Sequence, residues 1–392
     1  MPKQWPQVAL GEILTERNET PDPTLIKRGI IPIISKIRFS DGEIEYRAES
    51  GTNTKMILIH PGDLVLSGIN AMKGAIAIYQ PETSQRATAT IHYAAYEVNK
   101  EKADIRYLWW LLRSQYFQEI LTQQVPQGIK TELKAKRLLP VSVPLPNIDE
   151  QRRILIIIES LLSRISELNV LQEKSIVEIK ALLPSIRSKT FSSFQLQYPL
   201  LPLSEIADIQ LGKMLSPKSK SGENPLPYLR NANVQWDLLD LSFINKMDFS
   251  PKEIEKYSLL RGDILVCEGG KIGRAAIWNN EIDGCLYQKA LHRVRVDLKK
   301  VFPRYILHCL FWGSTSGQFS DLKTQTTIPH LPAIKLKRFL IPVPPLAIQN
   351  EVVDYLDNMQ NSINRLLYMQ QVALNEQNDL IASILSKAFQ GV

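Results

Sequence analysis

The amino-acid sequence repeats itself about 198 residues apart, and this repeat constrains the fold more than any other feature. Three pairs of segments carry it: Pro61–Val65 and Arg261–Leu265, which share Gly-Asp; Val143-Pro144…Gln151 and Val343-Pro344…Gln349; and Ser185–Phe191 and Ser383–Phe389, which share Ser-Ile-x-Ser-Lys-x-Phe. A repeat half as long as the chain indicates two copies of one domain-plus-helix unit, because solenoids repeat over far shorter distances.

Each copy ends in a stretch with a sustained heptad pattern. Its apolar residues, in alternating steps of four and three, are Ile154, Ile158, Leu161, Ile165, Leu168, Ile179, Leu183 and Ile186 in the first stretch, and Val352, Leu356, Met359, Ile363, Leu366, Ala373, Leu380 and Ile384 in the second. This spacing predicts two coiled-coil helices of about 40 residues. Polar residues interrupt the pattern at Gln172, Ser175, Gln370 and Gln377, and Pro184 should kink the first helix or end its regular part near Leu183.

Before each helix, short apolar strands alternate with Gly and Pro turns, which is typical of mixed α/β domains. We therefore predict a first domain at 1–146, a long helix at 147–197, a second domain at 198–344 and a C-terminal helix at 345–392. The aromatic stretches 106–112 and 304–312 should be core helices. Because residues 192–204 are too few to return along a rod of about 60 Å, the two helices should pair antiparallel. The predicted fold class is thus α/β (mixed α+β), with two similar domains, an antiparallel coiled coil and a pseudo-twofold internal repeat.

The net charge of +7 is concentrated in the two domains. Residues 1–146 carry +3 and residues 198–344 carry +6, whereas 147–197 carry +1 and 345–392 carry −3. A modest basic excess on globular domains is compatible with contact to nucleic-acid phosphates. The sequence has neither a signal-peptide pattern nor an apolar run of 18 residues, so we expect a cytoplasmic protein.

The sequence contains no convincing catalytic or metal-binding constellation. Asp263, Glu268 and Lys271 imitate a nuclease site, but one residue too many precedes the lysine, and a strand with a turn explains them. No glycine-rich motif opens a helix, so no dinucleotide or S-adenosylmethionine site is indicated, and the five histidines lack ligand spacing. The three cysteines, Cys267, Cys285 and Cys309, include no CxxC, and we expect partly buried free thiols. We conclude that the chain binds and does not catalyse.

The ordered set of motifs resembles the specificity subunit of type I restriction–modification systems. The resemblance covers the whole chain and is carried by the domain–helix–domain–helix order, by Ile-Pro-x-Pro-Pro-Leu…Gln at 341–349, by Ser-Ile-Leu-x-Lys-Ala-Phe-x-Gly at 383–391, and by the domain openings at Trp5–Ile13 and Tyr198–Ile206. The first copy departs from the pattern: Ser142 and Leu145 stand where the second has Pro342 and Pro345, and two extra residues precede its glutamine.

The resemblance implies a non-catalytic subunit that recognises a bipartite, asymmetric sequence in double-stranded DNA. Each copy would be a target-recognition domain, and the helix pair would fix the spacing of the two half-sites. Two methyltransferase subunits, one near each copy, would supply S-adenosylmethionine and the chemistry, so we expect no cofactor in this chain. The resemblance also allows a motor–nuclease subunit to join the complex.

Polar and basic residues on segments that differ between the copies are the candidates for DNA contact, since base contacts specify sequence and phosphate contacts position the protein. Three segments per copy qualify: the stretch after the first Pro-containing strand, a glycine-flanked lysine segment, and a polar loop before the proline hinge. In the first copy the candidates are Ser35, Lys36, Arg38, Asn70, Lys73, Gln127, Lys130 and Thr131. In the second copy they are Arg230, Asn231, Asn233, Lys271, Arg274, Gln288, Lys289, Gln325, Thr326, Thr327 and His330.

Two other functions stay open from the sequence. One is the specificity component of a related type II-like multi-subunit system with the same recognition domains. The other is a structural adaptor whose coiled coil recruits proteins and whose domains bind no DNA, although the +6 charge of the second domain disfavours it.

Overall fold

The computed structural model describes residues 5–48, 54–80, 85–125, 132–216, 222–270, 272–319 and 330–390. The chain forms two compact units, the first made of Met1–Gln172 and Gln371–Val392 and the second of Glu173–Gln370. The division between them runs through both long helices, α5 (Ile148–Gln197) and α10 (Leu346–Gln390). Each unit therefore holds one globular copy and a segment of each helix.

The elements of the first copy precede α5. They are β1 (Gln7–Ala9), β2 (Leu14–Glu16), α1 (Pro23–Lys27), β3 (Ile34–Ile37), β4 (Ile44–Tyr46), β5 (Met56–Ile59), β6 (Leu64–Ser67), the 3-10 turn η2 (Ala71–Lys73), β7 (Ile76–Ile78), β8 (Ala87–Thr90), β9 (Tyr93–Val98), α2 (Ile105–Arg113), α3 (Gln115–Gln124), α4 (Ala135–Leu138) and β10 (Ser142–Pro144).

The elements of the second copy lie between α5 and α10. They are β11 (Leu200–Pro202), α6 (Leu203–Ile206), β12 (Ala207–Leu211), β13 (Pro225–Leu229), the 3-10 turn η4 (Asn231–Asn233), β14 (Val234–Gln235), β15 (Leu238–Leu239), β16 (Asn245–Asp248), α7 (Pro251–Tyr257), β17 (Ile264–Cys267), β18 (Ala275–Ile277), β19 (Leu286–Tyr287), β20 (Leu291–Val296), α8 (Pro303–Thr315), α9 (Ala333–Lys337) and β21 (Leu340–Pro342).

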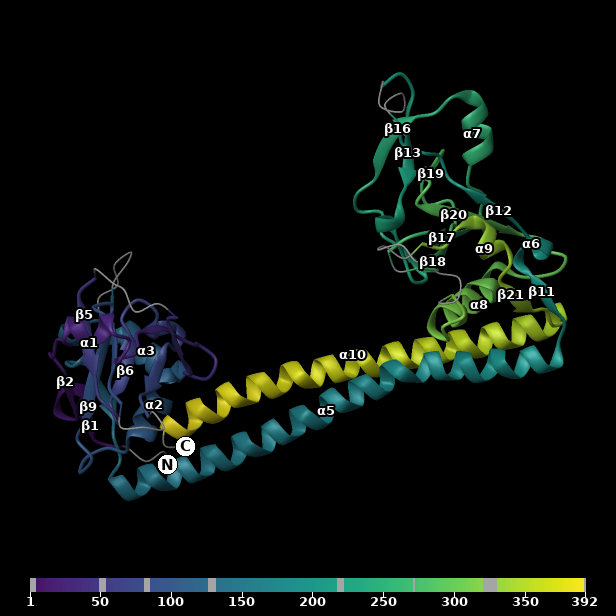
Figure 1. The fold of residues 1–392 in the computed structure, drawn as a ribbon. Coiled ribbons are helices and arrows are strands. Elements are labelled where there is room, and N and C mark those ends of the chain that lie inside the picture. Colours follow the sequence, from purple (N-terminus) through teal and green to yellow (C-terminus); the bar gives the residue numbers. More distant parts are fainter. Residues whose placement is uncertain are drawn as a thin grey trace. The chain divides into compact units, whose positions relative to one another are not determined.

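A four-stranded antiparallel sheet forms the centre of each copy (Figure 1). Its strand order is β2-β9-β6-β7 in the first copy and β12-β20-β17-β18 in the second. The central strands β6 and β17 are buried at every position, which explains why all their residues except Ser67 are apolar. The smaller sheets differ, with β3-β4 and β5-β8 in the first copy and β16-β13-β19 and β14-β15 in the second. The repeat thus preserves the central sheet and varies the outer one.

The two predicted aromatic core helices are confirmed as α2 and α8. Tyr107 and Tyr305 occupy equivalent positions on them and are both fully buried. Each tyrosine meets the phenylalanine near the end of a long helix edge to face, Tyr107 with Phe389 of α10 at 5.3 Å and Tyr305 with Phe191 of α5 at 5.8 Å. The repeated Ser-Ile-x-Ser-Lys-x-Phe motif is therefore the anchor by which each helix ends in a domain core.

A fully buried glutamine fastens the start of each long helix to the preceding domain. Gln349 donates from Nε2 to the carbonyls of Pro344 (2.9 Å) and Lys300 (2.8 Å), and its Oε1 accepts from the amide of Phe302 at 3.1 Å. Gln151 makes the same three bonds, to Pro146 (2.8 Å), Lys102 (3.0 Å) and Asp104 (2.8 Å).

These bonds correct the alignment of the proline hinges. Pro146, not Pro144, is the counterpart of Pro344, and Pro144 is the counterpart of Pro342, as their pairing with Gln7 and Leu200 also shows. The first copy consequently has no extra residues before its glutamine. The prediction of two extra residues was wrong because the shared Val-Pro dipeptide pointed to a register two residues away.

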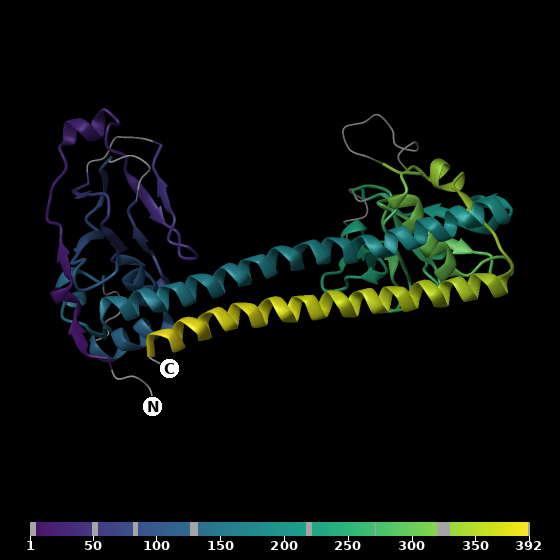
Figure 2. The same ribbon diagram turned by 90° about the horizontal axis from the view of Figure 1, so that it is seen from below.

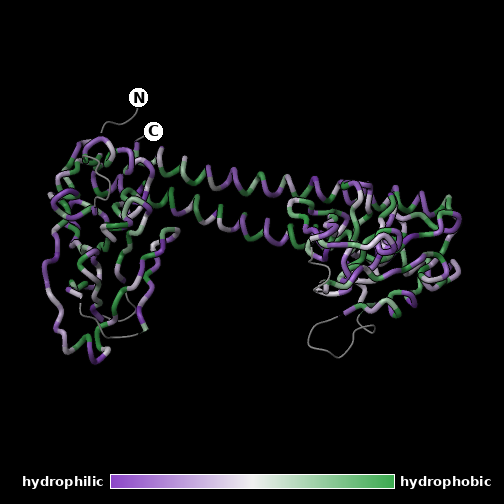
Figure 3. The backbone as a smooth tube through the Cα atoms, turned by 90° about the horizontal axis from the view of Figure 1, so that it is seen from above, coloured by the Kyte–Doolittle hydropathy of each residue, from purple (hydrophilic) through white to green (hydrophobic). Residues whose placement is uncertain are grey.

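Within each unit, the segments of α5 and α10 lie side by side and antiparallel, as predicted (Figures 1 and 2). In the first unit, Ile154 and Ile158 of α5 share a hydrophobic cluster with Phe389 of α10. In the second unit, Ile179 and Leu183 of α5 cluster with Ile363 of α10. Figure 3 shows hydrophobic and hydrophilic positions alternating along both helices, as an amphipathic pattern requires.

Part of the predicted helix seam was wrong. Leu168, Leu366 and Leu380 are 51%, 44% and 50% exposed, and the partly buried positions lie one residue further along, at Asn169, Leu367 and Ile381. One of these positions holds the polar residue Asn169, so a heptad pattern built only from apolar residues assigns the wrong position to the helix interface. Helix α5 also continues through Pro184 to Gln197 and does not end near Leu183. The helices have 50 and 45 residues, more than the 40 predicted.

The second unit contains a buried polar network between its helices. Arg187 of α5 is 5% exposed and donates from Nε to Nδ1 of His308 at 3.2 Å, while Nε2 of His308 lies 3.0 Å from Asp357 of α10. Arg304 also binds Asp357, at 2.7 Å. Burial lowers the pKa of Arg187 to about 10 and lowers the pKa of His308 below its usual value. The network joins α5, α8 and α10 in one unit.

Candidate nucleic-acid interface

Main-chain hydrogen bonds bring the candidate segments of the second copy to one end of its central sheet. The amide of Gln288 donates to Leu229 (2.9 Å), that of Glu268 to Ala290 (3.0 Å), and that of Leu331 to Glu268 (2.7 Å). These bonds connect the turn Arg230–Asn233, hereafter the recognition turn, with the segments around Arg274, Lys289 and His330. The sequence treated them as separate loops, and the fold makes them neighbours.

The first copy uses equivalent bonds. The amide of Gly68 donates to His92 and the amide of Leu133 donates to Gly68, both at 2.8 Å. Gly68, His92 and Leu133 are thus the counterparts of Glu268, Ala290 and Leu331. The two copies therefore share this main-chain framework but carry different side chains around it. The sequence predicted this difference between the copies.

Arg230, at the start of the recognition turn, is a partly buried arginine that packs on an aromatic ring. Its guanidinium lies over the ring of Phe243, 5.5 Å from the centroid, and its Nε has no hydrogen-bond partner among the described residues. Arginine can bond two acceptors of a guanine at once, so an arginine held against a ring and still short of acceptors suits that contact.

Asn233, in contrast, is buried and hydrogen-bonded within the turn, which disfavours its prediction as a DNA contact. It is 4% exposed, and its side-chain Nδ2 donates to the carbonyls of Asp240 (2.9 Å) and Phe243 (3.0 Å). Its Oδ1 accepts from the amide of Arg230 at 3.1 Å. A short polar side chain that closes a turn looks the same in sequence as one that faces solvent.

Arg274 is also engaged within the protein. Its guanidinium donates to the carbonyl of Asn231 at 2.7 Å and to Oε1 of Gln235 at 3.1 Å. Of the remaining candidates here, Lys289 and His330 are exposed and Gln288 is partly buried. Gly269 pairs with His330 in an isolated β-bridge, which fixes where the third segment returns to the sheet.

In the first copy, Ser35 and Lys36 lie within strand β3 itself and not in a stretch that follows a strand, so their predicted position was wrong, while their contact with DNA stays a prediction. The apolar residues Ile34 and Ile37 bury one side of β3, which leaves Lys36 exposed on the hairpin with β4. Arg38 follows the strand and forms ion pairs with Asp41 (2.8 Å) and with Glu43. Two carboxylates balance its charge, so Lys36 is the more available cation.

The second candidate segment of the first copy forms the turn η2. Asn70 stands before this turn and does not cap it with its side chain. Lys73 is exposed, with Nζ 6.0 Å from the ring centroid of Phe39 in the neighbouring hairpin. The turn ends at Gly74, whose φ of 90° favours glycine. The structure thus brings the hairpin and the predicted lysine segment together.

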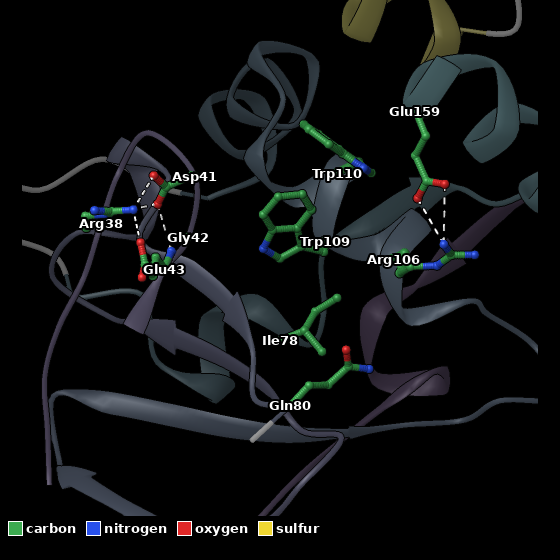
Figure 4. A pocket seen from close by; sticks show the side chains of 10 residues that line it. All are labelled: Arg38, Asp41, Gly42, Glu43, Ile78, Gln80, Arg106, Trp109, Trp110 and Glu159. Atoms are coloured by element: carbon green, nitrogen blue, oxygen red, sulfur yellow. Dashed lines mark hydrogen bonds and ion pairs between the residues drawn. The ribbon is translucent and has the colours of Figure 1, made fainter. Parts of the chain in front are cut away.

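The hairpin packs on Trp109 of α2 beside a hollow of about 480 Å³ (Figure 4). Gly42 has a φ of 76°, and a Cβ there would lie 2.6 Å from the carbonyl of Ile76. Trp109 donates to that carbonyl at 2.9 Å, and Arg106 and Glu159 of α5, which pair at 3.1 Å, lie on the side of the hollow away from the hairpin. The close approach of Gly42 to Ile76 and Trp109 packs the hairpin against the rest of the first copy.

Seven of the predicted DNA-contacting residues lie outside the described residues. They are Gln127, Lys130, Thr131, Lys271, Gln325, Thr326 and Thr327. They stay predictions.

Exposed basic residues that were not predicted from the sequence follow the third candidate segment in both copies. They are Lys134, Lys136 and Arg137 around α4, and Lys337 and Arg338 at the end of α9. A basic cluster next to a recognition loop is a recognised signal for phosphate contact, and its recurrence at the same place in both copies could have revealed it. Arg113, which donates to the carbonyl of Phe39 at 2.8 Å, was likewise not predicted from the sequence.

Three general findings complete the description of the site. Within the described ranges, no group of three or more His, Cys, Asp or Glu side chains could hold a metal ion. The three cysteines are free thiols, as predicted, and are fully buried. Among the helices that the structure describes, none is long and apolar enough to span a bilayer.

Comparison with known proteins places both copies in one family. The chain is 21% identical to the type I restriction enzyme EcoBI specificity subunit of Escherichia coli, over 85% of this chain and 74% of that subunit. It is 23% identical to the type I restriction enzyme EcoKI specificity subunit of Escherichia coli K12, over 64% of this chain and 57% of that one. The crystal structure of the HsdS subunit from Thermoanaerobacter tengcongensis has a similar fold, with a TM-score of 0.63 and 21% identity over 100% of this chain and 98% of that one.

The family model of the type I restriction modification DNA specificity domain matches the sequence twice, at residues 2–180 and 197–375. The two matches correspond to the two halves of the internal repeat and span most of the sequence. The chain belongs to the family of the type I restriction modification DNA specificity domain.

Proposed function

We propose that this chain is the DNA-recognition subunit of a type I restriction–modification complex and recognises a bipartite, asymmetric sequence in double-stranded DNA. The observation that supports this most strongly is the pair of equivalent frameworks, in which Gly68 and Glu268 form the same main-chain bonds while the polar side chains around them differ. Each copy then recognises its own half-site. Because the side chains differ, so do the half-sites.

The contacts divide into base recognition and phosphate binding. Arg230 and the side chain of Asn231 recognise bases in the second half-site, because arginine and asparagine suit guanine and adenine edges. Lys36, Lys73 and Lys289, which are exposed, bind phosphates together with the basic residues around α4 and α9. The basic excess of both copies favours approach to DNA at low salt.

The chain itself supplies recognition, and partner subunits supply the chemistry. Two methyltransferase subunits carry S-adenosylmethionine, one near each copy, and a motor–nuclease subunit joins in complexes that cleave. Large apolar side chains on the outside of the helix segments support such docking: Ile156 and Leu171 are 68% and 61% exposed in the first unit, and Val177 and Tyr368 are 67% and 71% exposed in the second.

Methyl transfer and DNA binding, measured with and without partners, test the proposal. The purified chain should transfer no methyl group from S-adenosylmethionine to DNA, whereas the chain with its methyltransferase subunits should methylate a restricted set of sites. Binding should weaken as salt rises, because counterions are released from DNA. Turnover by the chain alone would overturn the non-catalytic assignment. Salt-independent or absent DNA binding by the full complex would favour the adaptor function.

A further inference from the structure

The recognition turn is held from within by its own residues and from behind by Arg274, with the thiol of Cys267 also 3.8 Å from the carbonyl of Asn231. Asn233 closes the turn through its bonds to Asp240, Phe243 and the amide of Arg230. Arg274 approaches from the segment between β17 and β18 and donates to the carbonyl of Asn231 at 2.7 Å. That carbonyl belongs to the residue directly after Arg230, so the orientation of the carbonyl affects the position of the Arg230 Cα and the direction of its side chain.

Arg274 is itself fixed on both sides. Its carbonyl accepts from the amide of Cys267 at 2.8 Å, which ties it to the central strand β17. Its guanidinium spans two acceptors, the carbonyl of Asn231 and Oε1 of Gln235 at 3.1 Å. The planar fork of arginine can hold two acceptors at once, which the single ammonium of lysine does far less well. Arg274 therefore links the central sheet rigidly to the recognition turn.

The other arginine has different surroundings. Both arginines have a buried Nε without a hydrogen-bond partner in the part of the chain that the structure describes, so the difference lies elsewhere in the guanidinium. Arg274 donates from both terminal nitrogens to acceptors inside the second copy, whereas the guanidinium of Arg230 packs on Phe243, a side chain that is 64% exposed. A DNA contact by Arg274 would have to break the bonds that shape the turn.

A similar arrangement occurs in the first copy, on an unrelated element. Arg113 of α2 donates to the carbonyl of Phe39 at 2.8 Å, and Phe39 directly follows Arg38. The guanidinium of Arg113 also lies 4.4 Å from the ring of Trp109, beneath the hairpin. In both copies, then, an arginine from the domain framework holds a main-chain carbonyl in the candidate DNA-binding segment.

We infer that Arg274 is a positioning residue, which sets the base preference of Arg230 by holding the carbonyl of Asn231 and does not bind DNA itself. The inference rests on the proposed function and adds that Arg230 contacts the base while Arg274 positions Arg230. It also reassigns Arg274, which the sequence placed among the DNA-contacting residues.

A double-mutant cycle on the full complex tests the inference. The chain with its methyltransferase subunits is used to select binders from a library of random duplexes, as wild type, Arg230→Ala, Arg274→Lys and both together. Arg274→Lys keeps the positive charge and removes the fork. It should reduce preference about tenfold or more at the same base position that Arg230→Ala relaxes, and leave the salt dependence of binding unchanged. In the Arg230→Ala background it should cause no further loss.

Three results would overturn the inference. The first is an unchanged preference at that position in Arg274→Lys. The second is an additive loss in the double variant, which a general structural defect would produce. The third is a salt slope that falls by about one in Arg274→Ala with preference retained, as for a phosphate contact. If Arg274→Lys fails to fold, Gln235→Ala takes its place, because it removes one acceptor of the Arg274 guanidinium. Gln235→Ala should weaken base preference at the same position, and an unchanged preference in that variant would also overturn the inference.

A wild-type complex without any sequence preference would instead refute the proposed function.

Discussion

At the residue scale, the structure separates side chains that the sequence treats alike. Asn231 and Asn233 lie two residues apart in a polar segment, yet Asn233 is buried and closes the turn. Arg230 and Arg274 each stand between an apolar residue and a polar or glycine residue, yet only Arg274 donates to two acceptors of its own chain through its terminal nitrogens. Because hydrogen bonding depends on three-dimensional neighbours, residue type alone could not divide the candidates.

Arg230 and Lys289 should respond differently to removal. Arg230→Ala should relax one base position of the target, at a cost of about 1–3 kcal/mol, because a bidentate base contact is lost. Lys289→Ala should weaken binding about equally for all sequences and reduce the salt slope by about one, as for a phosphate contact. Binding isotherms at several salt concentrations, on the selected target and on single-base variants, distinguish the two. Equal, sequence-independent effects of both substitutions would contradict the assignment.

Two buried histidines should make the second unit sensitive to mild acid. Burial lowers the pKa of His292 and of His308, whereas an unfolded histidine titrates near 6.5. Nδ1 of His308 accepts a hydrogen bond from the Arg187 guanidinium. Protonation of Nδ1 would remove this acceptor and place a second positive charge beside Arg187. The nearby Asp357 stays ionised in this range, because hydrogen bonds from His308 and Arg304 lower its pKa by more than burial raises it.

The folded form of each histidine therefore binds fewer protons than the unfolded form below pH 6.5. Stability should be fully retained above that pH and should fall as the pH drops from 6.5 toward 5. Chemical denaturation at a series of pH values measures this. In the double variant His292→Gln, His308→Gln, the amide can donate and accept without titrating, so the dependence in this window should be much reduced. An equally steep dependence in that variant would show that other groups cause it.

At the element scale, much of the fold follows from the sequence. The strands at 56–59 and 264–267, the aromatic helices and both long helices are where the apolar pattern predicts them. The errors fall where local pattern is weakest: Leu168 is exposed because a polar residue, Asn169, occupies the seam, and Pro184 is accommodated within a helix that is packed on both sides of it. Tertiary packing decided these positions.

The glutamine at the start of each long helix should matter more than any exposed residue near it. Gln349→Ala leaves the amide of Phe302 and the carbonyls of Lys300 and Pro344 without their partner inside the protein, so we expect a loss of at least about 2 kcal/mol in unfolding free energy. Gln151→Ala should cause a similar loss, because it breaks the same three bonds. Denaturant unfolding measures both, with the exposed Glu351→Ala as the control. A loss no larger than that of the control would contradict the proposed clamp.

At the scale of the whole molecule, the repeat explains why one chain can recognise two things. The central sheets, the glutamine clamps and the phenylalanine anchors are equivalent in the two copies, and the outer sheets and polar turns are not. The sequence predicted this division into framework and surface because shared residues mark the framework. It could not rank the surface residues, whose roles depend on which segments the fold brings together.

The helix pair is proposed to set the distance between half-sites, and matched insertions test that. Seven residues inserted between Gln172 and Ser175, with seven more between Gln370 and Gln377, keep the heptad phase and lengthen each helix by about 10 Å. The spacer of the recognised sequence should grow by about three base pairs, while both half-sites keep their bases. An insertion in one helix only serves as the control and should impair assembly. A folded, active double insertion with unchanged spacing would show that the helices do not set it.

Mapping the methylated sites in the genome of cells that carry this chain with its methyltransferase subunits tests the central claim most directly. Two copies with one framework and different polar surfaces should produce a target of two dissimilar half-sites, separated by a fixed number of unspecified base pairs. In cells carrying Arg230→Ala, one half-site should become less specific while the other half-site and the spacer stay the same. A continuous target, a palindromic target, or a change in both halves from that single substitution would contradict the assignment of one half-site to each copy.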